Sequence, residues 1–93
     1  MDQQRVLVLN AADNVAVALA PLLAGETIPV ECSSVTTSLT VRMPIPSGHK
    51  VALCALSTGD TALKYGQPIG RVTHPIAAGE HVHVHNLVST RAG

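Results

Sequence analysis

Three histidines alternate with valines near the end of the chain, in residues 81–86 (HVHVHN). Side chains two positions apart on a strand point to the same face, so this spacing predicts His81, His83 and His85 on one face and the valines in the core. Histidine changes charge near neutral pH and binds metal through its imidazole nitrogens. The pattern is compatible with the polar side of a half-exposed strand, but it also indicates a catalytic or metal-binding face.

The spacing along such a strand limits what the histidines can bind. Neighbouring positions on one face are roughly 7 Å apart, and the outer two of three are about 13 Å apart. Two adjacent imidazoles, such as those of His81 and His83, can therefore share one metal ion, whereas all three cannot without distortion. We expect a metal site here to draw further ligands from elsewhere in the chain.

Cationic and hydroxyl groups stand beside glycines in residues 48–50 (GHK) and 64–70 (KYGQPIG). A lysine in such a place can bind a substrate carboxylate, and a tyrosine can donate a hydrogen bond to a hydroxyl or enolate oxygen. Solvated turn charges and a packed ring would explain the same residues, and His74 is predicted to be a loop residue. Because no catalytic triad, phosphate-binding loop or carboxylate pair is found, a complete active site within this chain is not expected.

A short cassette recurs four times and indicates how these residues are positioned. Each copy has an aliphatic residue, two spacers, a glycine and a polar residue, and the glycines are Gly25, Gly48, Gly59 and Gly79. Glycine tolerates a positive φ, so each cassette predicts a tight turn that precedes a strand. Strands are predicted within residues 35–43, 50–56 and 80–88, and residues 14–23 favour a strand over a helix because Val and Leu alternate with Ala. The sequence predicts an all-β fold in a single domain over residues 1–93.

Composition narrows the classes of partner. Hydrophobic residues make up 46% of the 93, and Tyr65 is the only aromatic residue, so the core should be aliphatic. Six basic and six acidic residues give no net charge, so binding to nucleic acid or to an anionic membrane surface is not expected. With no long apolar run and no signal-peptide pattern in residues 1–9, we expect a cytoplasmic protein. Cys32 and Cys54 form no CxxC pair and are expected to be free thiols.

Four segments, taken together, resemble the SAF domain of altronate and galactarate dehydratases. They are residues 13–19 (DNVAVAL), 45–53 (IPSGHKVAL), 64–70 (KYGQPIG) and 76–87 (IAAGEHVHVHNL). The resemblance spans nearly the whole chain in the family's order and implies a β-clip fold. Residues 23–26, 36–40 and 54–55 depart from the family pattern, which weakens the choice of substrate rather than that of fold.

The resemblance implies a small accessory subunit or N-terminal domain that works beside a large catalytic subunit. The family's reactions dehydrate a sugar acid, such as altronate or galactarate, to a 2-keto-3-deoxy acid. In a two-subunit version, sulfite is lost from sulfolactate instead. A divalent metal, iron or manganese, is implied for the complete enzyme, held in this chain or in the large subunit.

The residues that match the family's motifs supply the candidate site. His49, His81 and His83 are the candidate catalytic residues, and His81 and His83 are also the candidate metal ligands. The candidate substrate-binding residues are Lys50, Lys64, Tyr65, His85 and Asn86. Self-association through strand edges stays open.

Two other interpretations remain at this point. One is a non-catalytic, carbohydrate-binding SAF module, although such surfaces usually offer aromatic platforms and this chain has a single aromatic residue. The other is a domain cut from a longer dehydratase, although Met1 and the short tail 91–93 favour a natural small protein.

Overall fold

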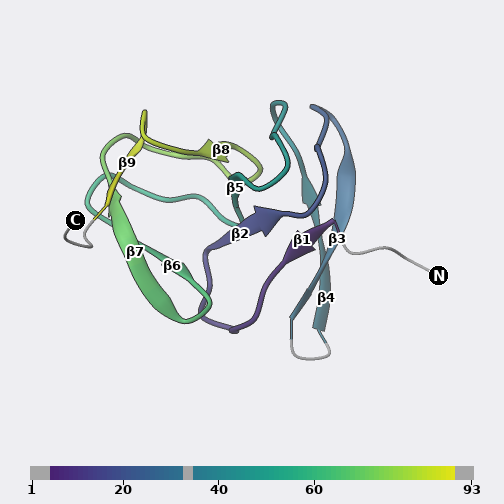
Figure 1. The fold of residues 1–93 in the computed structure, drawn as a ribbon, viewed down its shortest axis with the longest axis horizontal. Coiled ribbons are helices and arrows are strands. Elements are labelled where there is room, and N and C mark those ends of the chain that lie inside the picture. Colours follow the sequence, from purple (N-terminus) through teal and green to yellow (C-terminus); the bar gives the residue numbers. More distant parts are fainter. Residues whose placement is uncertain (1–4, 33–34, 90–93) are drawn as a thin grey trace.

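The computed structural model describes residues 5–32 and 35–89, without the side chains of Cys32 and Val35. Strands and no helices are found among these residues. They are β1 (Val6–Leu7), β2 (Val15–Ala18), β3 (Thr27–Cys32), β4 (Val35–Thr40), β5 (Lys50–Ala52), β6 (Thr61–Lys64), β7 (Gln67–Val72), β8 (His81–Val82) and β9 (Leu87–Ser89). The strands form three antiparallel sheets, in the orders β1-β2-β5-β8, β3-β4 and β6-β7-β9 (Figure 1). The predicted all-β fold class is confirmed.

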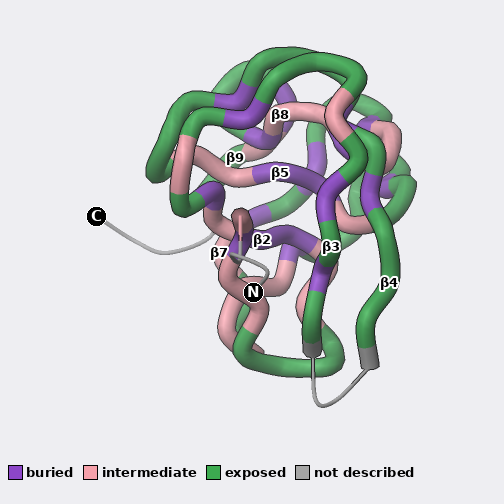
Figure 2. The backbone as a smooth tube through the Cα atoms, turned by 90° about the vertical axis from the view of Figure 1, so that its right-hand side faces the viewer, coloured by how far each residue is buried: buried purple, intermediate pink, exposed green. Residues whose placement is uncertain are grey.

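The four-stranded sheet lies between the other two sheets (Figure 1). Its inner strands β2 and β5 are largely buried (Figure 2) and contribute side chains to two separate aliphatic cores. Val15 and Ala52 belong to the core that includes residues of β6 and β7, whereas Ala16 and Val51 belong to the core that includes residues of β3 and β4. A strand that is buried on both faces carries apolar residues at every position, which explains the VAVA sequence of β2.

All four cassettes are tight turns that precede a strand, as predicted. Their glycines have φ between 84° and 96°. The aliphatic residue that begins each cassette is buried, and the cassettes associate in two pairs through the bridges Leu22–Ile45 and Leu56–Ile76. The β-clip is therefore built from two pairs of turns.

Within each pair, hydrogen bonds from the glycines connect the turns reciprocally. The Gly25 amide donates to the Val41 carbonyl, and the Gly48 amide donates to the Ala18 carbonyl, each at 2.7 Å. The second pair repeats this pattern, with Gly59 donating to Val72 and Gly79 donating to Ala52. Position 79 requires glycine for a second reason, because a Cβ there would collide with the carbonyl oxygen of Thr40.

The predicted strand over residues 80–88 is wrong. β8 ends at Val82, residues 83–86 form a turn, and β9 begins at Leu87 in a different sheet. Val82 is fully buried, but Val84 is 82% exposed, so the two valines do not share a core face. The buried side chain of Asn86 accepts a hydrogen bond from the His83 amide and donates one to the His81 carbonyl. These local side-chain bonds replace the strand ladder and end β8.

The other predicted elements are shorter than expected but correctly placed. β4 ends at Thr40 and β5 at Ala52, and the preference for a strand over a helix near Val15 is confirmed by β2. No helix in the described ranges is long and apolar enough to cross a membrane. Cys54 is an exposed free thiol. The side chain of Cys32, the first four residues of the N-terminal segment considered as a leader, and the tail at 91–93 lie outside the described residues.

Candidate functional site

Three histidines from different parts of the chain meet where β5 pairs with β8. His49 immediately precedes β5, and His81 is paired with Val51 across the two strands. Nδ1 of His49 lies 2.9 Å from Nε2 of His81, although the residues are 32 positions apart. The ring of His83 stacks on both, with centroids 4.9 Å from His49 and 5.2 Å from His81. One ligand nitrogen from each of the three lies within 4.8 Å of the others.

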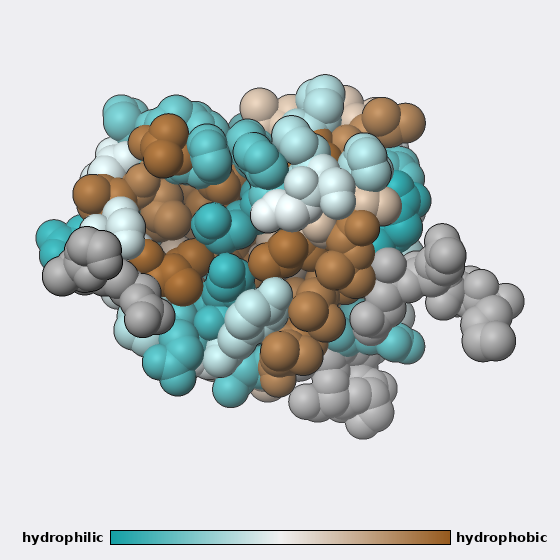
Figure 3. Space-filling model, viewed as in Figure 1, coloured by the Kyte–Doolittle hydropathy of each residue, from teal (hydrophilic) through white to brown (hydrophobic). Residues whose placement is uncertain are grey.

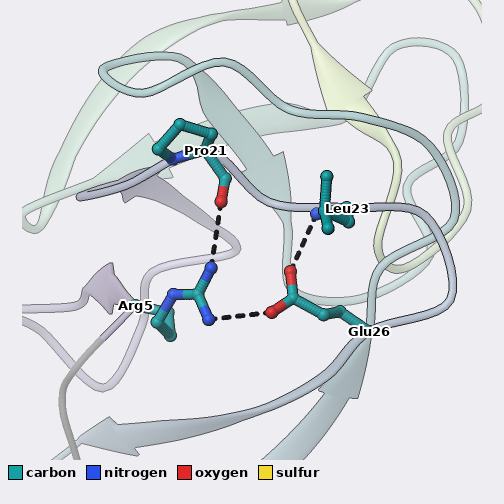
Figure 4. Close-up of polar contacts among 4 residues, drawn as sticks. All are labelled: Arg5, Pro21, Leu23 and Glu26. Carbon is teal, nitrogen blue, oxygen red and sulfur yellow. Dashed lines mark hydrogen bonds and ion pairs between the residues drawn. The ribbon is translucent and has the colours of Figure 1, made fainter.

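His49 occupies a turn position that has a structural role in the other three cassettes. There the residue after the glycine is acidic, and its carboxylate accepts a hydrogen bond from the amide of the first spacer residue. These pairs are Glu26 with Leu23 (Figure 4), Asp60 with Ser57 and Glu80 with Ala77, each at 2.8 Å. In the remaining cassette the first spacer is Pro46, which has no N–H to donate. The side chain at position 49 is therefore not needed to close its turn and is available to the histidine cluster.

The environment of His81 favours its neutral form. Burial is the largest cause that lowers its pKa, and the neighbouring basic groups of His49, His83, His85 and Lys50 lower it further. The short contact with His49 also requires one of the two facing nitrogens to be unprotonated, because a hydrogen bond needs an acceptor. At neutral pH His81 is therefore in the state that can bind metal or accept a proton.

The donor set of the cluster fits a divalent transition metal. Two nitrogens bound to one ion at about 2.1 Å each are about 3.0 Å apart at a right angle and about 3.4 Å apart at the tetrahedral angle, and the 2.9 Å separation of His49 and His81 is close to the first value. The three nitrogens together spread over 4.8 Å, so a ring must turn inward for all three to bind one ion. His83 supplies a third imidazole and is exposed, so the cluster is open to solvent on its side. In this geometry His49, from outside residues 81–85, is an additional nitrogen donor beside His81 and His83.

A cavity of about 220 Å³ adjoins the histidines and is lined by cationic and apolar groups. Lys50, Lys64 and His83 supply its basic side chains. The remaining lining residues are Ile69, Val84, Leu87 and Ser89, so none of the acidic residues that the structure describes lines it. Burial is the main cause that lowers the pKa of Lys50, and the charge of Lys64 lowers it further. This cavity favours an anionic ligand, which would relieve the repulsion between the two lysines.

Tyr65 lies at the tip of the β6–β7 hairpin, and its described contacts are made there. Tyr65 and Gly66 both have positive φ, at 55° and 76°, which is typical of a two-residue hairpin turn. The carboxylate of Asp13 accepts hydrogen bonds from both of their amides. Nζ of Lys64 lies 5.2 Å from the centre of the Tyr65 ring. None of these contacts links Tyr65 to the histidine cluster.

The structural role of Asp13 was not anticipated from the sequence. A signal existed, because Asp13 and Asn14 begin the first segment of the resemblance, but only the fold brings them against the hairpin.

The remaining candidates lie around the turn that follows β8. The ring of His85 is 5.6 Å from that of His81, and Asn86 is buried, with its amide bonded to neighbouring residues of the turn. His74 is an exposed loop residue, as predicted, and lines a depression on another side of His81 and His85. The structure thus gathers His49, Lys50, Lys64, His81, His83 and His85 around one site.

Comparison with known protein families identifies the domain. The family described as the altronate/galactarate dehydratase SAF domain matches residues 4–90. The chain belongs to this family. The fold and family expected from the motifs are therefore confirmed, and the histidine cluster is a feature of this SAF domain.

Characterised relatives of the SAF domain are lyases. Altronate dehydratase of Escherichia coli (strain K12) is 46% identical over 78 residues, which are 84% of this chain and 15% of that enzyme. Altronate dehydratase of Bacillus subtilis (strain 168) is 38% identical over the same shares. The alpha subunit of (2R)-sulfolactate sulfo-lyase from Paracoccus pantotrophus is 49% identical over 53 residues, or 57% of this chain and 79% of the subunit.

These coverages define how the SAF domain relates to whole enzymes. It spans only about 15% of the length of the altronate dehydratases. It spans most of a subunit in the sulfolactate enzyme of Paracoccus pantotrophus, whose name indicates an assembly of several subunits.

Proposed function

We propose that this SAF domain is the accessory part of a cytoplasmic hydroxy-acid lyase whose large catalytic part is a separate subunit. The reaction is the dehydration of a sugar acid, such as altronate or galactarate, to a 2-keto-3-deoxy acid. The observation that carries the proposal is the cluster of His49, His81 and His83 beside a cavity lined by two lysines. The similarity to two altronate dehydratases supports the class of substrate.

The chemistry of such an elimination suits these side chains. A proton is removed next to the substrate carboxylate, negative charge develops on an enediolate, and a hydroxide leaves from the neighbouring carbon. Cationic groups stabilise the enediolate, and a proton donor assists the leaving hydroxide. Lys50 and Lys64 would hold the carboxylate in their cavity, and the histidines would transfer or donate protons. Tyr65 lies beside Lys64 and would contact the substrate only at the margin of the cavity.

A divalent metal would be held by His49, His81 and His83. Such an ion would act as a Lewis acid toward the substrate oxygens. Of the two metals expected, iron suits an all-imidazole donor set better than manganese, which prefers oxygen ligands. Both facing nitrogens of His49 and His81 would have to be unprotonated, so binding should release the proton they share.

A second candidate is the small subunit of a sulfolactate sulfo-lyase. It is favoured by coverage, because the chain spans 79% of the alpha subunit from Paracoccus pantotrophus. Loss of sulfite is the same kind of elimination with a different leaving group, so the roles of the lysines and histidines would not change. A non-catalytic binding module would need neither the clustered imidazoles nor a catalytic partner.

The test is reconstitution with the large subunit from the same source. Activity is measured as 2-oxo acid formed from altronate and galactarate, and as sulfite released from (2R)-sulfolactate. The proposal predicts activity on a sugar acid that depends on this chain and falls at least tenfold in His81→Ala, since general acid–base groups contribute about a hundredfold or more. Sulfite release alone would favour the second candidate, and unchanged activity of His81→Ala would reject a role for the cluster.

A further inference from the structure

Asn86 is the one buried polar residue in the described parts of the chain, with 5% of its surface exposed. It directly follows the three alternating histidines and ends the turn that carries His83. Its backbone takes part in that turn, because the Asn86 amide donates to the His83 carbonyl and the Asn86 carbonyl accepts from the Thr73 amide. A buried amide side chain must be satisfied by specific partners, so its contacts define its role.

Two backbone partners fix the orientation of the Asn86 side chain. Nδ2 donates to the carbonyl of His81 at 2.8 Å, and Oδ1 accepts from the amide of His83 at 2.9 Å. Turning the amide over would place a donor against a donor and an acceptor against an acceptor. This clamp turns the chain after β8 at the point where the His83 ring stacks on those of His49 and His81.

The same amide determines the tautomer of His85. Nδ2 of Asn86 also lies 3.0 Å from Nε2 of His85. Because Nδ2 only donates, Nε2 of His85 must accept and carries no proton. The ring proton of neutral His85 is therefore on Nδ1, and Nε2 is occupied by Asn86.

We propose that Asn86 is a positioning residue that organises the histidine site. It holds His83 against His49 and His81, and it selects the Nδ1–H tautomer of the neutral His85 ring. His85 then offers a hydrogen-bond donor for an oxygen of the ligand, such as a hydroxyl or carboxylate oxygen, and its Nε2 does not serve as a further metal ligand. The tautomer stands on the contacts alone, whereas the effect on metal binding rests on the proposed function.

Asn14 provides a matched control because its side chain makes the same pair of hydrogen bonds to the backbone at another place. Its Oδ1 accepts from the Leu63 amide at 2.7 Å, and its Nδ2 donates to the Thr61 carbonyl at 2.9 Å. Asn14 therefore clamps β6 as Asn86 clamps the turn after β8, and none of its side-chain hydrogen bonds reaches a histidine.

The first experiment is ¹⁵N NMR of the histidine rings, with assignments from single histidine variants. In wild-type protein, the neutral form of the His85 ring should carry its proton on Nδ1. In Asn86→Asp the carboxylate accepts from Nε2–H, so His85 should gain a proton there, while Asn14→Asp should leave the His85 pattern unchanged. A wild-type His85 protonated on Nε2, or an unchanged pattern in Asn86→Asp, would overturn the proposal. If Asn86→Asp fails to fold, the wild-type tautomer alone decides it.

The second experiment is a titration with Zn²⁺ alone. Removing groups that orient metal ligands typically weakens binding by about 10-fold to 100-fold, so Asn86→Asp and Asn86→Ala should fall in that range and Asn14→Asp should bind as wild type does. Equal binding by the Asn86 and Asn14 variants would contradict a positioning role for Asn86 toward metal. If wild type does not bind Zn²⁺, the metal site of the proposed function is contradicted, and so is the metal part of this inference. The tautomer of His85 is still decided by the NMR experiment.

Discussion

One cassette departs from the other three in the residue that follows its glycine. Three cassettes place a carboxylate after the glycine and use it to accept an amide hydrogen bond, whereas the fourth has Pro46 and His49 at the corresponding positions. Proline removes the donor that the carboxylate would satisfy, so an acid at position 49 would gain no bond within the turn. The histidine instead contacts His81 at 2.9 Å. Pro46 and His49, which look unrelated in sequence, thus form one joint departure from the cassette.

At the same scale, Lys50 is predicted to bind the substrate carboxylate. Lys50→Gln should raise KM for the hydroxy acid by roughly tenfold, because a hydrogen bond to a charged group contributes about 1.5 kcal/mol or more. Steady-state kinetics of the reconstituted enzyme measure this change. Arg71→Gln removes an exposed positive charge from β7 and should leave KM unchanged. Equal effects of the two substitutions would mean that only net charge matters.

At the scale of the turns, Glu26 links stability to pH. Its carboxylate accepts from the Leu23 amide and pairs with Arg5, which also donates to the Pro21 carbonyl (Figure 4). The backbone hydrogen bond from Leu23 is the largest cause that lowers the pKa of Glu26, and Arg5 lowers it further, while desolvation opposes both. Because the folded pKa lies below the usual 4.5, the stabilisation is fully present above that pH and is lost as pH falls through the folded value.

Glu26→Gln should therefore lower the melting temperature at neutral pH, and this difference should shrink as the solution is acidified. Thermal unfolding of wild type and variant between neutral pH and about pH 3 measures it. The curves should approach each other toward the acid end, as the Glu26 carboxylate becomes protonated. A difference that stays constant with pH would assign the effect to packing rather than to the carboxylate.

The cassette comparison predicts coupling between positions 46 and 49. His49→Glu alone should not stabilise the turn, because Pro46 has no amide hydrogen to donate. With Pro46→Ala in place, the glutamate can accept that hydrogen bond, and the coupling should be about 1 kcal/mol in the free energy of unfolding. Denaturant unfolding of the wild type, the two single variants and the double variant measures this term. A coupling near zero would mean that the three acidic caps are incidental.

The sequence predicted individual turns and strands better than it predicted which strands pair and which side chains meet. The cassettes were found because a positive φ demands glycine, and β2 was found because its residues alternate. The alternation of residues 81–86 led to the wrong prediction of one continuous strand. Period-two spacing does not reveal that the Asn86 side chain bonds the backbone of His81 and His83, where β8 ends. The contact between His49 and His81 depends on the register of β5 with β8, and local pattern cannot give that register.

At the scale of the whole molecule, hydrophobic side chains remain at the surface, and the face in Figure 3 shows several brown groups. Among the described residues, the large hydrophobic side chains that are exposed are those of Leu9, Leu19, Leu23, Met43, Val84 and Val88. Exposed apolar patches often mark interfaces with partners. Both the large subunit of the proposed enzyme and a second copy of the chain remain candidates, and Val84 is notable because it lies between His83 and His85.

The account depends on the chain forming one metal site from residues that are distant in sequence. The most direct test is anaerobic titration of the protein with Fe²⁺ by calorimetry, in wild type, His49→Ala and the control His74→Ala. The account predicts one ion per chain, binding weakened at least about tenfold in His49→Ala, as expected when a ligand is lost, and unchanged binding in His74→Ala. Binding that is absent in wild type, or as tight in His49→Ala as in wild type, would contradict it.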